Sequence, residues 1–189
     1  REQLSALGID FVDSPMTGGP PQADKGELNL AVGSTADDAR ELAPLFAAIA
    51  KNVVYAGAPG AGNVAKLLNN FLSIMDRVAA SCASLMAQDA EVDLAVIKEF
   101  VSVSGGYSRG FQTEIEAIIA DRFPLGFALE LALKDLRYAS ELAGSSGRSF
   151  ALLRELQALL TDATAAGYGK KDLNTVYQHL AAASRRAPA

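Results

Sequence analysis

The chain has 189 residues, half of them hydrophobic, and its 17 basic and 22 acidic residues give a net charge of −5. This length suits one domain or one and a half, and the absence of a basic stripe with interleaved aromatics disfavours a nucleic-acid surface. Cys82 is the one cysteine, which excludes an internal disulfide and suits a reducing compartment, so we expect a cytoplasmic location.

The first third of the sequence predicts an α/β segment. It begins Arg1-Glu2-Gln3-Leu4, without an initiator methionine or a signal-peptide pattern, so we expect a fragment that starts within a helix. Short apolar runs bounded by turn residues then predict strands. The expected elements are strands over 9–13, 28–32 and 52–55, a loop over 14–26 and a helix over 37–48.

From the glycine-rich hinge at 56–62 onward, the sequence predicts only helices. Apolar residues recur at helical spacing from Asn63 to Gln88, which predicts a helix about 39 Å long. That length exceeds the usual globular helix and is typical of a spine between two domains. The expected shorter helices cover 93–103, 109–120, 127–143, 149–166 and 172–184, followed by a frayed tail over 184–189.

A polar stripe interrupts the apolar pattern of the long helix. Lys66, Asn69, Asn70 and Ser73 share one side, because positions three, four and seven apart are neighbours on a helix. Asparagine is a poor helix former, so a pair of them is an unusual choice for a solvated face. Spacing alone leaves two interpretations open, a reaction site or a stripe that satisfies a neighbouring loop.

A second candidate is the loop segment Thr17-Gly18-Gly19, which follows a predicted strand. A hydroxyl and two glycine amides can together bind one anion, and open α/β sheets bind ligands where their strands end. The alternative is a tight surface turn. A third candidate, Lys134-Asp135 on a late helix, is by itself ordinary for an exposed charged pair.

The remaining chemistry-bearing residues favour structural roles. The hinge glycines do not form G-x-G-x-x-G, and no metal-ligand spacing occurs. His179 has no acidic or cysteine partner nearby in sequence, so we interpret it as structural. Cys82 falls on the apolar side of the long helix and is expected in the core.

Taken in order and spacing, these segments resemble the β-hydroxyacid dehydrogenase family of the 6-phosphogluconate dehydrogenase superfamily, which includes 3-hydroxyisobutyrate dehydrogenases and tartronate semialdehyde reductases. Residues 13–19 resemble its substrate loop D-A-P-V-S-G-G, with Thr17 in place of the serine and Met16 in place of the valine. Residues 60–70 resemble its catalytic helix G-x-G-x-x-x-K-x-x-N-N. Further matches are 26–33, for the next strand, and 123–136, for F-x-P-x-F followed by K-D-L.

The resemblance implies the C-terminal portion of a Rossmann-type NAD(P)-binding domain over 1–58, lacking that domain's N-terminal part. An all-α substrate and oligomerisation domain over 59–189 would follow. It implies hydride transfer between NAD or NADP and a small β-hydroxy acid or its semialdehyde, with this fragment alone impaired or inactive. The implied roles are Lys66 for catalysis and Lys134 for the cofactor. Among the substrate-binding residues, Thr17, Gly18 and Gly19 would hold the substrate carboxylate, and Asn70 would orient the substrate and Lys66 by hydrogen bonds.

The resemblance further implies a homodimer or homotetramer formed through the helical domain. The charge pattern, the lack of a long apolar run and the lack of metal-ligand spacing predict no nucleic acid, membrane or metal partner. Two other functions stay open. One is a non-catalytic helical dimerisation module, and the other is an imine reductase-like relative, although such enzymes commonly replace the catalytic lysine that Lys66 matches. A 6-phosphogluconate dehydrogenase would need a much longer helical domain than about 130 residues, which disfavours it.

Overall fold

The computed structural model describes residues 2–184. It divides into two compact units, one ending at Asn69 and one starting at Asn70. The helix α4 (Ala61–Asp89) continues through this boundary. Of the frayed tail predicted over 184–189, Ser184 is the last residue of a helix and the rest lies outside the described residues.

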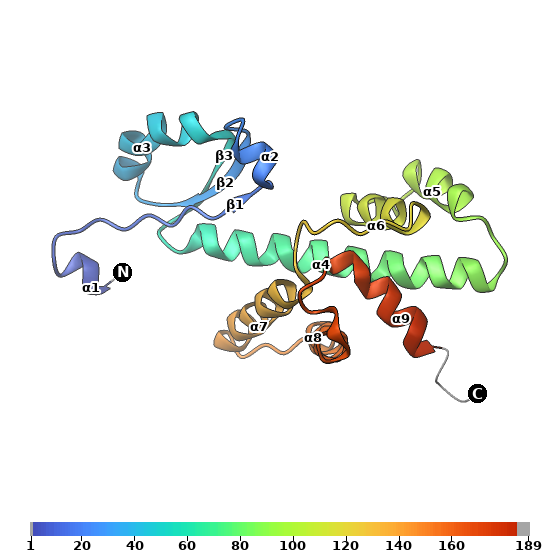
Figure 1. The fold of residues 1–189 in the computed structure, drawn as a ribbon. Helices are drawn as coiled ribbons and strands as arrows, with labels where there is room; N and C mark the ends of the chain where they lie inside the picture. Colours follow the sequence, from blue (N-terminus) through green and yellow to red (C-terminus); the bar gives the residue numbers. More distant parts are fainter. Residues whose placement is uncertain (1, 185–189) are drawn as a thin grey trace. The chain divides into compact units, whose positions relative to one another are not determined.

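The first unit is α/β, as the sequence predicts, and consists of a three-stranded mixed sheet with helices. The strand order is β1-β2-β3, with β1 antiparallel and β3 parallel to the central strand (Figure 1). Helix α3 connects the two parallel strands, and its start is capped by Thr35, whose hydroxyl accepts the Asp38 amide at 3.2 Å. The elements are α1 (Glu2–Ser5), β1 (Met16–Thr17), α2 (Pro20–Ala23), β2 (Leu28–Gly33), α3 (Ala36–Ile49) and β3 (Ala50–Gly57).

The core of this unit follows from the alternation in β2. Leu28, Leu30 and Val32 are buried on one side of the strand, where Phe46 of α3 and Ala50 of β3 pack against them. Because successive side chains of a strand point to opposite faces, the residues between them face away from this core.

The strand expected over 9–13 does not form. Residues 9–12 have no regular structure, and Asp13 alone makes a bridge, to Gly33. Ser14 and Pro15 separate this bridge from β1, and a proline has no N–H to donate to a sheet. The loop expected over 14–26 instead contains β1 and the short helix α2.

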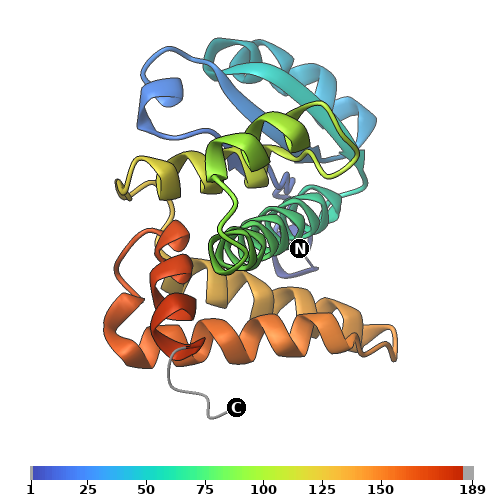
Figure 2. The same cartoon turned by 90° about the vertical axis from the view of Figure 1, so that its right-hand side faces the viewer.

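The second unit is helical, as predicted. Helices α7 and α8 run side by side in both views (Figures 1 and 2) and bury a core with α4. The core residues include Ile74, Val78, Leu129, Leu133, Leu136, Leu153, Leu156, Leu160, Leu173 and Val176. The elements after α4 are α5 (Leu94–Ser102), α6 (Arg109–Ile119), α7 (Leu129–Ser145), α8 (Ala151–Ala163), the turns η1 (Thr164–Tyr168) and η2 (Leu173–Thr175), and α9 (Val176–Ser184).

Two details of this unit differ from expectation. The helix predicted over 149–166 is α8 followed by the π-helical turn η1, inside which Gly167 adopts a positive φ of 91° that breaks the helical backbone. Cys82 is exposed, so its predicted place in the core is wrong. The buried row of α4 passes through Ile74, Val78 and Ser81, and the next residue points about 100° away from Ser81.

None of the helices described over residues 2–184 combines the length and the hydropathy needed to cross a membrane.

Candidate functional site

The start of α4 is held by a buried carboxylate from elsewhere in the first unit. Asp13 is 5% exposed, and its two oxygens accept the amides of Gly60 and Asn63, the latter at 2.7 Å. Its main chain is paired as well, since it exchanges two backbone hydrogen bonds with Gly33, at 3.1 and 2.8 Å. The first N–H groups of a helix have no partner within the helix, so this carboxylate supplies one.

Glycines make room for this carboxylate. A Cβ at Gly33 would collide with the Asp13 carboxylate and lie 2.9 Å from the Ala58 carbonyl oxygen. A Cβ at Gly62 would lie 2.8 Å from Asp13 Oδ2 and collide with the main chain of Ala31. Both positions therefore require glycine because other backbone or a charged group approaches them closely.

The predicted polar stripe lies in the first turns of α4. Lys66 is half-buried in the second turn, within the first unit. Asn70 follows one turn later and is only 7% exposed, whereas Asn69 beside it is exposed. The stripe is therefore divided: Lys66 and Asn70, four residues apart, share the more buried side of the helix, and Asn69 lies on the exposed side.

In the second unit, Asp135 connects two of the predicted site residues. Asn70 Nδ2 donates to Asp135 Oδ2 at 2.6 Å, and Lys134 Nζ lies 3.1 Å from Asp135 Oδ1. Lys134 is 52% exposed, and its Nζ lies 5.7 Å from the centre of the Tyr138 ring. The sequence places Asp135 in the K-D-L segment, but its pairing with Asn70 of α4, 65 residues away, is visible only in the fold.

The Thr17–Gly19 loop is supported by a chain of side-chain amides. Asn52 Nδ2 donates to Asn29 Oδ1 at 2.7 Å, and Asn29 Nδ2 donates to the Thr17 hydroxyl oxygen at 3.2 Å. Because the Thr17 oxygen accepts in this chain, the hydroxyl proton can be donated to a further acceptor. The Gly19 amide donates to Gln22 Oε1 at 3.0 Å, so an anion bound by this amide would have to displace Gln22.

Gly18 also has a backbone that favours glycine. Its φ is +115°, and a Cβ there would lie 3.0 Å from Leu28 Cδ2 and 3.2 Å from Gln22 Cβ. This conformation makes the loop turn away sharply after β1.

The six predicted site residues are divided between the units. Thr17, Gly18, Gly19 and Lys66 belong to the first, and Asn70 and Lys134 belong to the second. Over the described residues 2–184, no group of three or more His, Cys, Asp or Glu side chains is arranged to hold a metal ion. The His179 ring packs edge-on against Tyr168 at 5.8 Å, a contact that suits a structural histidine.

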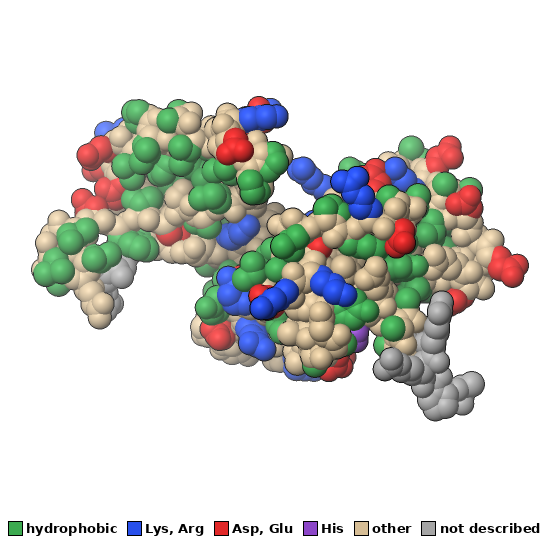
Figure 3. Space-filling view, viewed as in Figure 1, with side chains coloured by type: hydrophobic (Ala, Val, Ile, Leu, Met, Phe, Trp, Pro, Cys, Tyr) green, Lys and Arg blue, Asp and Glu red, His purple; other side chains and the backbone are tan. Residues whose placement is uncertain are grey.

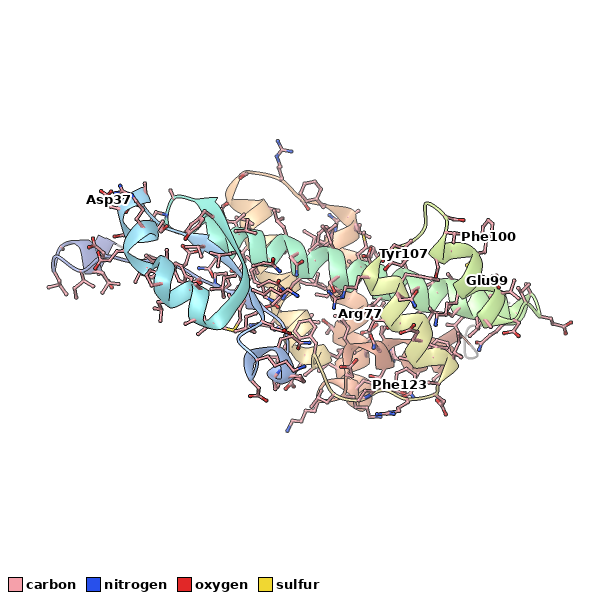
Figure 4. The ribbon with its side chains drawn as sticks, turned by 90° about the horizontal axis from the view of Figure 1, so that it is seen from above. Asp37, Arg77, Glu99, Phe100, Tyr107 and Phe123 are labelled. Atoms are coloured by element: carbon pink, nitrogen blue, oxygen red, sulfur yellow. The ribbon has the colours of Figure 1, made fainter. Side chains whose placement is uncertain are left out.

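A buried carboxyl outside these segments also stands out. Glu114 of α6 is 0% exposed, and burial raises its pKa to about 8, although the Ser81 hydroxyl and the Arg77 charge oppose that rise. Ser81 donates to Glu114 Oε1 at 2.7 Å, while Glu114 Oε2 and Arg77 Nε are buried without a hydrogen-bond partner. Figure 4 labels Arg77 on α4.

Comparison with known families gives two matches that together cover most of the chain. Residues 60–180 match the NAD-binding domain of NADP-dependent 3-hydroxyisobutyrate dehydrogenase. Residues 1–57 match the NAD binding domain of 6-phosphogluconate dehydrogenase.

Individual relatives agree with these matches. The chain is 27% identical to 2-(hydroxymethyl)glutarate dehydrogenase of Eubacterium barkeri, over 89% of this chain and 56% of the relative. It is also 27% identical to mitochondrial 3-hydroxyisobutyrate dehydrogenase of Bos taurus, over 95% of this chain and 55% of the relative. A crystal structure of 3-hydroxyisobutyrate dehydrogenase from Salmonella typhimurium matches with a TM-score of 0.82 and 27% identity, covering 94% of this chain and 62% of that one.

The chain therefore spans less than two thirds of the length of these relatives. Members of this family are NAD(P)-dependent oxidoreductases that act on small hydroxyacids. Because the first family match covers residues 60–180 and the second covers residues 1–57, the chain belongs to the β-hydroxyacid dehydrogenase family of the 6-phosphogluconate dehydrogenase superfamily.

Proposed function

We propose that the gene product containing this chain transfers a hydride between NAD or NADP and a small β-hydroxy acid or its semialdehyde. The observation that carries this proposal is the arrangement at the start of α4. The half-buried Lys66 follows a helix start whose amides donate to Asp13. The buried side-chain amide of Asn70 lies one turn later and donates a hydrogen bond to Asp135.

The residues present fit only part of a dinucleotide. Lys134 offers an exposed ammonium group, and α7 and α8 carry Arg137 and Arg154 in addition. Figure 3 shows Lys and Arg side chains over these two helices. The sequence contains no G-x-G-x-x-G turn to bind a pyrophosphate, so we expect the 189 residues by themselves to be impaired or inactive. Bound NAD(P) supplies or accepts the hydride.

In the proposed reaction, Lys66 handles the proton. Oxidation of an alcohol needs a base for the hydroxyl proton, and reduction needs an acid at the carbonyl oxygen; an amine and its ammonium form serve both purposes at Nζ. Asn70, held by Asp135 at 2.6 Å, would orient the substrate beside that group. The Thr17 hydroxyl with the Gly18 and Gly19 amides would bind the substrate carboxylate, once Gln22 has released the Gly19 amide.

The test is Lys66→Ala in the gene product that contains this chain. Loss of a general acid and base costs about 10²–10⁴-fold in rate, so kcat should fall by about 1,000-fold while substrate binding stays measurable by calorimetry. Lys51→Ala removes an exposed lysine of the same unit and should leave kcat unchanged. Wild-type turnover in the Lys66→Ala protein would exclude this role.

For assembly we propose a homodimer or homotetramer formed through the helical unit. Exposed apolar side chains on and beside α5 support this, among them Phe100 at 68% and Val103 at 86% exposure. Phe100 and Tyr107 lie on the α5 side of the helical unit (Figure 4). Clustered exposed apolar groups are typical of protein interfaces. Light scattering of wild type and of Phe100→Glu tests this, because a monomeric wild type would contradict it.

We also propose a cytoplasmic location and a domain boundary near residue 58. The single cysteine suits a reducing compartment, and the two family matches meet between residues 57 and 60. Cell fractionation tests the first proposal, and limited proteolysis between 56 and 62 tests the second.

A further inference from the structure

We propose that Asp13 is a positioning residue for the reaction, because its carboxylate fixes the first turn of α4 and thereby the position of Lys66 relative to the sheet of the first unit. This inference rests on the proposed function for its kinetic consequence. Its structural part, the anchoring of the helix, stands on the first unit alone.

The anchoring differs from the local side-chain caps of three other helices. Helices α3, α5 and α6 are capped by Thr35, Asp93 and Ser108, each the residue directly before its own helix. The acceptor at the start of α4 instead comes from 47 and 50 residues away in sequence. A cap from the residue before a helix stabilises the helix without fixing its position in the fold. A cap from a residue far away in sequence also fixes where the helix begins relative to that residue.

Asp13 is itself fixed in two ways. Its main chain is paired with Gly33 at the end of β2, so its side chain projects from a defined point of the sheet. Each carboxylate oxygen accepts one amide of the α4 start, and a Cβ at Gly33 or Gly62 would intrude on the same carboxylate. The close fit on both sides leaves one position for the helix start relative to the strand.

The charge suits this task. The N-terminal end of a helix carries roughly half a positive charge and several N–H groups without partners, so a buried carboxylate placed there is paired rather than isolated. An amide side chain offers only one accepting oxygen, so Asp13→Asn would keep one of the two hydrogen bonds and Asp13→Ala neither.

A displaced helix start would affect Lys66 directly. The lysine follows Asn63 by three residues, less than one turn, so it moves with the anchored segment. A misplacement of about 1 Å in a reacting group can cost about 100-fold in rate. The main-chain pairing of Asp13 with Gly33 does not depend on the side chain, so the Thr17–Gly19 loop should keep its place.

The kinetic experiment compares Asp13→Ala, Asp13→Asn and Asp93→Ala in the gene product that contains this chain. We expect Asp13→Ala to lower kcat about 100-fold with KM changed less than about threefold, and Asp13→Asn to fall between it and wild type. Asp93→Ala removes a local cap of α5 and should leave kcat as in wild type. Wild-type kcat in a folded Asp13→Ala protein overturns the inference.

Amide hydrogen exchange gives a second readout that does not need activity. In Asp13→Ala, we expect peptides covering residues 58–66 to exchange at least tenfold faster, with peptides of α3 and α7 unchanged. Unchanged protection at 58–66 overturns the inference even if no substrate is found. If wild type turns over no hydroxy acid with NAD or NADP, the proposed function fails, while the exchange result still decides the anchoring.

Discussion

Two acidic side chains, one in each unit, are buried in different ways. In the first, both oxygens of Asp13 accept backbone amides at the start of a helix. In the second, Glu114 is surrounded by side chains, with one oxygen bonded to Ser81 and the other without a partner. The difference teaches that backbone amides can pair a buried carboxylate fully, whereas burial among side chains raises the pKa of Glu114 to about 8.

Asp172 shows that this difference depends on the partners and not on the unit. It is buried in the helical unit, yet it accepts three backbone amides, from Gly126, Phe127 and Asn174, at 2.8, 3.0 and 3.0 Å. It thereby joins the segment before α7 to the turn η2 in the way that Asp13 joins a strand end to α4. Three predictions probe the contrast between amide-paired and side-chain-paired acids.

The largest effect is expected for Asp172→Ala. It leaves three backbone amides without their acceptor, and each buried donor left unsatisfied costs about 1–3 kcal/mol, so we expect a loss of about 3–5 kcal/mol of unfolding free energy. Urea denaturation measures this loss. Asp93→Ala, which removes an exposed cap, should cost only about 1 kcal/mol. Equal losses in the two variants would contradict the importance of buried amide pairing.

The next effect concerns the pH dependence of stability at Glu114. Its folded-state pKa of about 8 exceeds the ordinary 4.5, so the folded protein binds the proton more tightly than the unfolded one. Stability from this group is complete below pH 4.5 and declines as pH rises through about 8. Glu114→Gln should remove a slope of roughly 1 kcal/mol per pH unit, measured by urea unfolding between about pH 5 and pH 8. Parallel curves for variant and wild type would show that Glu114 is already ionised.

The smallest effect is expected where glycine makes room for an amide-paired acid. Gly62→Ala places a methyl group against Asp13 and the Ala31 main chain, which should cost roughly 2 kcal/mol as overpacking does. Gly105→Ala is the matched control, because a Cβ there meets nothing within 4 Å. Thermal unfolding of both variants measures the difference. A Gly62→Ala protein with the melting temperature of wild type would show that the start of α4 can shift to accommodate the methyl group.

Local pattern was enough to predict most elements of the fold. The apolar spacing from Asn63 to Gln88 predicts a helix that the structure extends to Ala61–Asp89, and the alternation over 28–32 predicts β2 with its buried face. These features depend on residues close in sequence, for which periodicity is a direct signal. The apolar run over 9–13 failed because a strand also needs a partner along its length, and only Asp13 has one.

The supports of the candidate site could not be predicted, because they are long-range. Asp13 meets the start of α4 across 47 residues or more, and Asn70 meets Asp135 across 65. No spacing rule connects residues so far apart in one sequence. The sequence also does not show that two acceptors compete for the Gly19 amide. Its position after a strand suits an anion, yet the Gln22 side chain, three residues further on, already accepts its hydrogen bond.

Helix α4 keeps two proposed reaction groups at a fixed spacing. Lys66 and Asn70 belong to different compact units but stand four residues apart on one unbroken helix. The rise of about 1.5 Å per residue fixes their separation along the axis at about 6 Å, whatever happens to the packing around them. Substitutions elsewhere in either unit therefore leave the axial spacing of Lys66 and Asn70 unchanged, because this spacing comes from the helix itself.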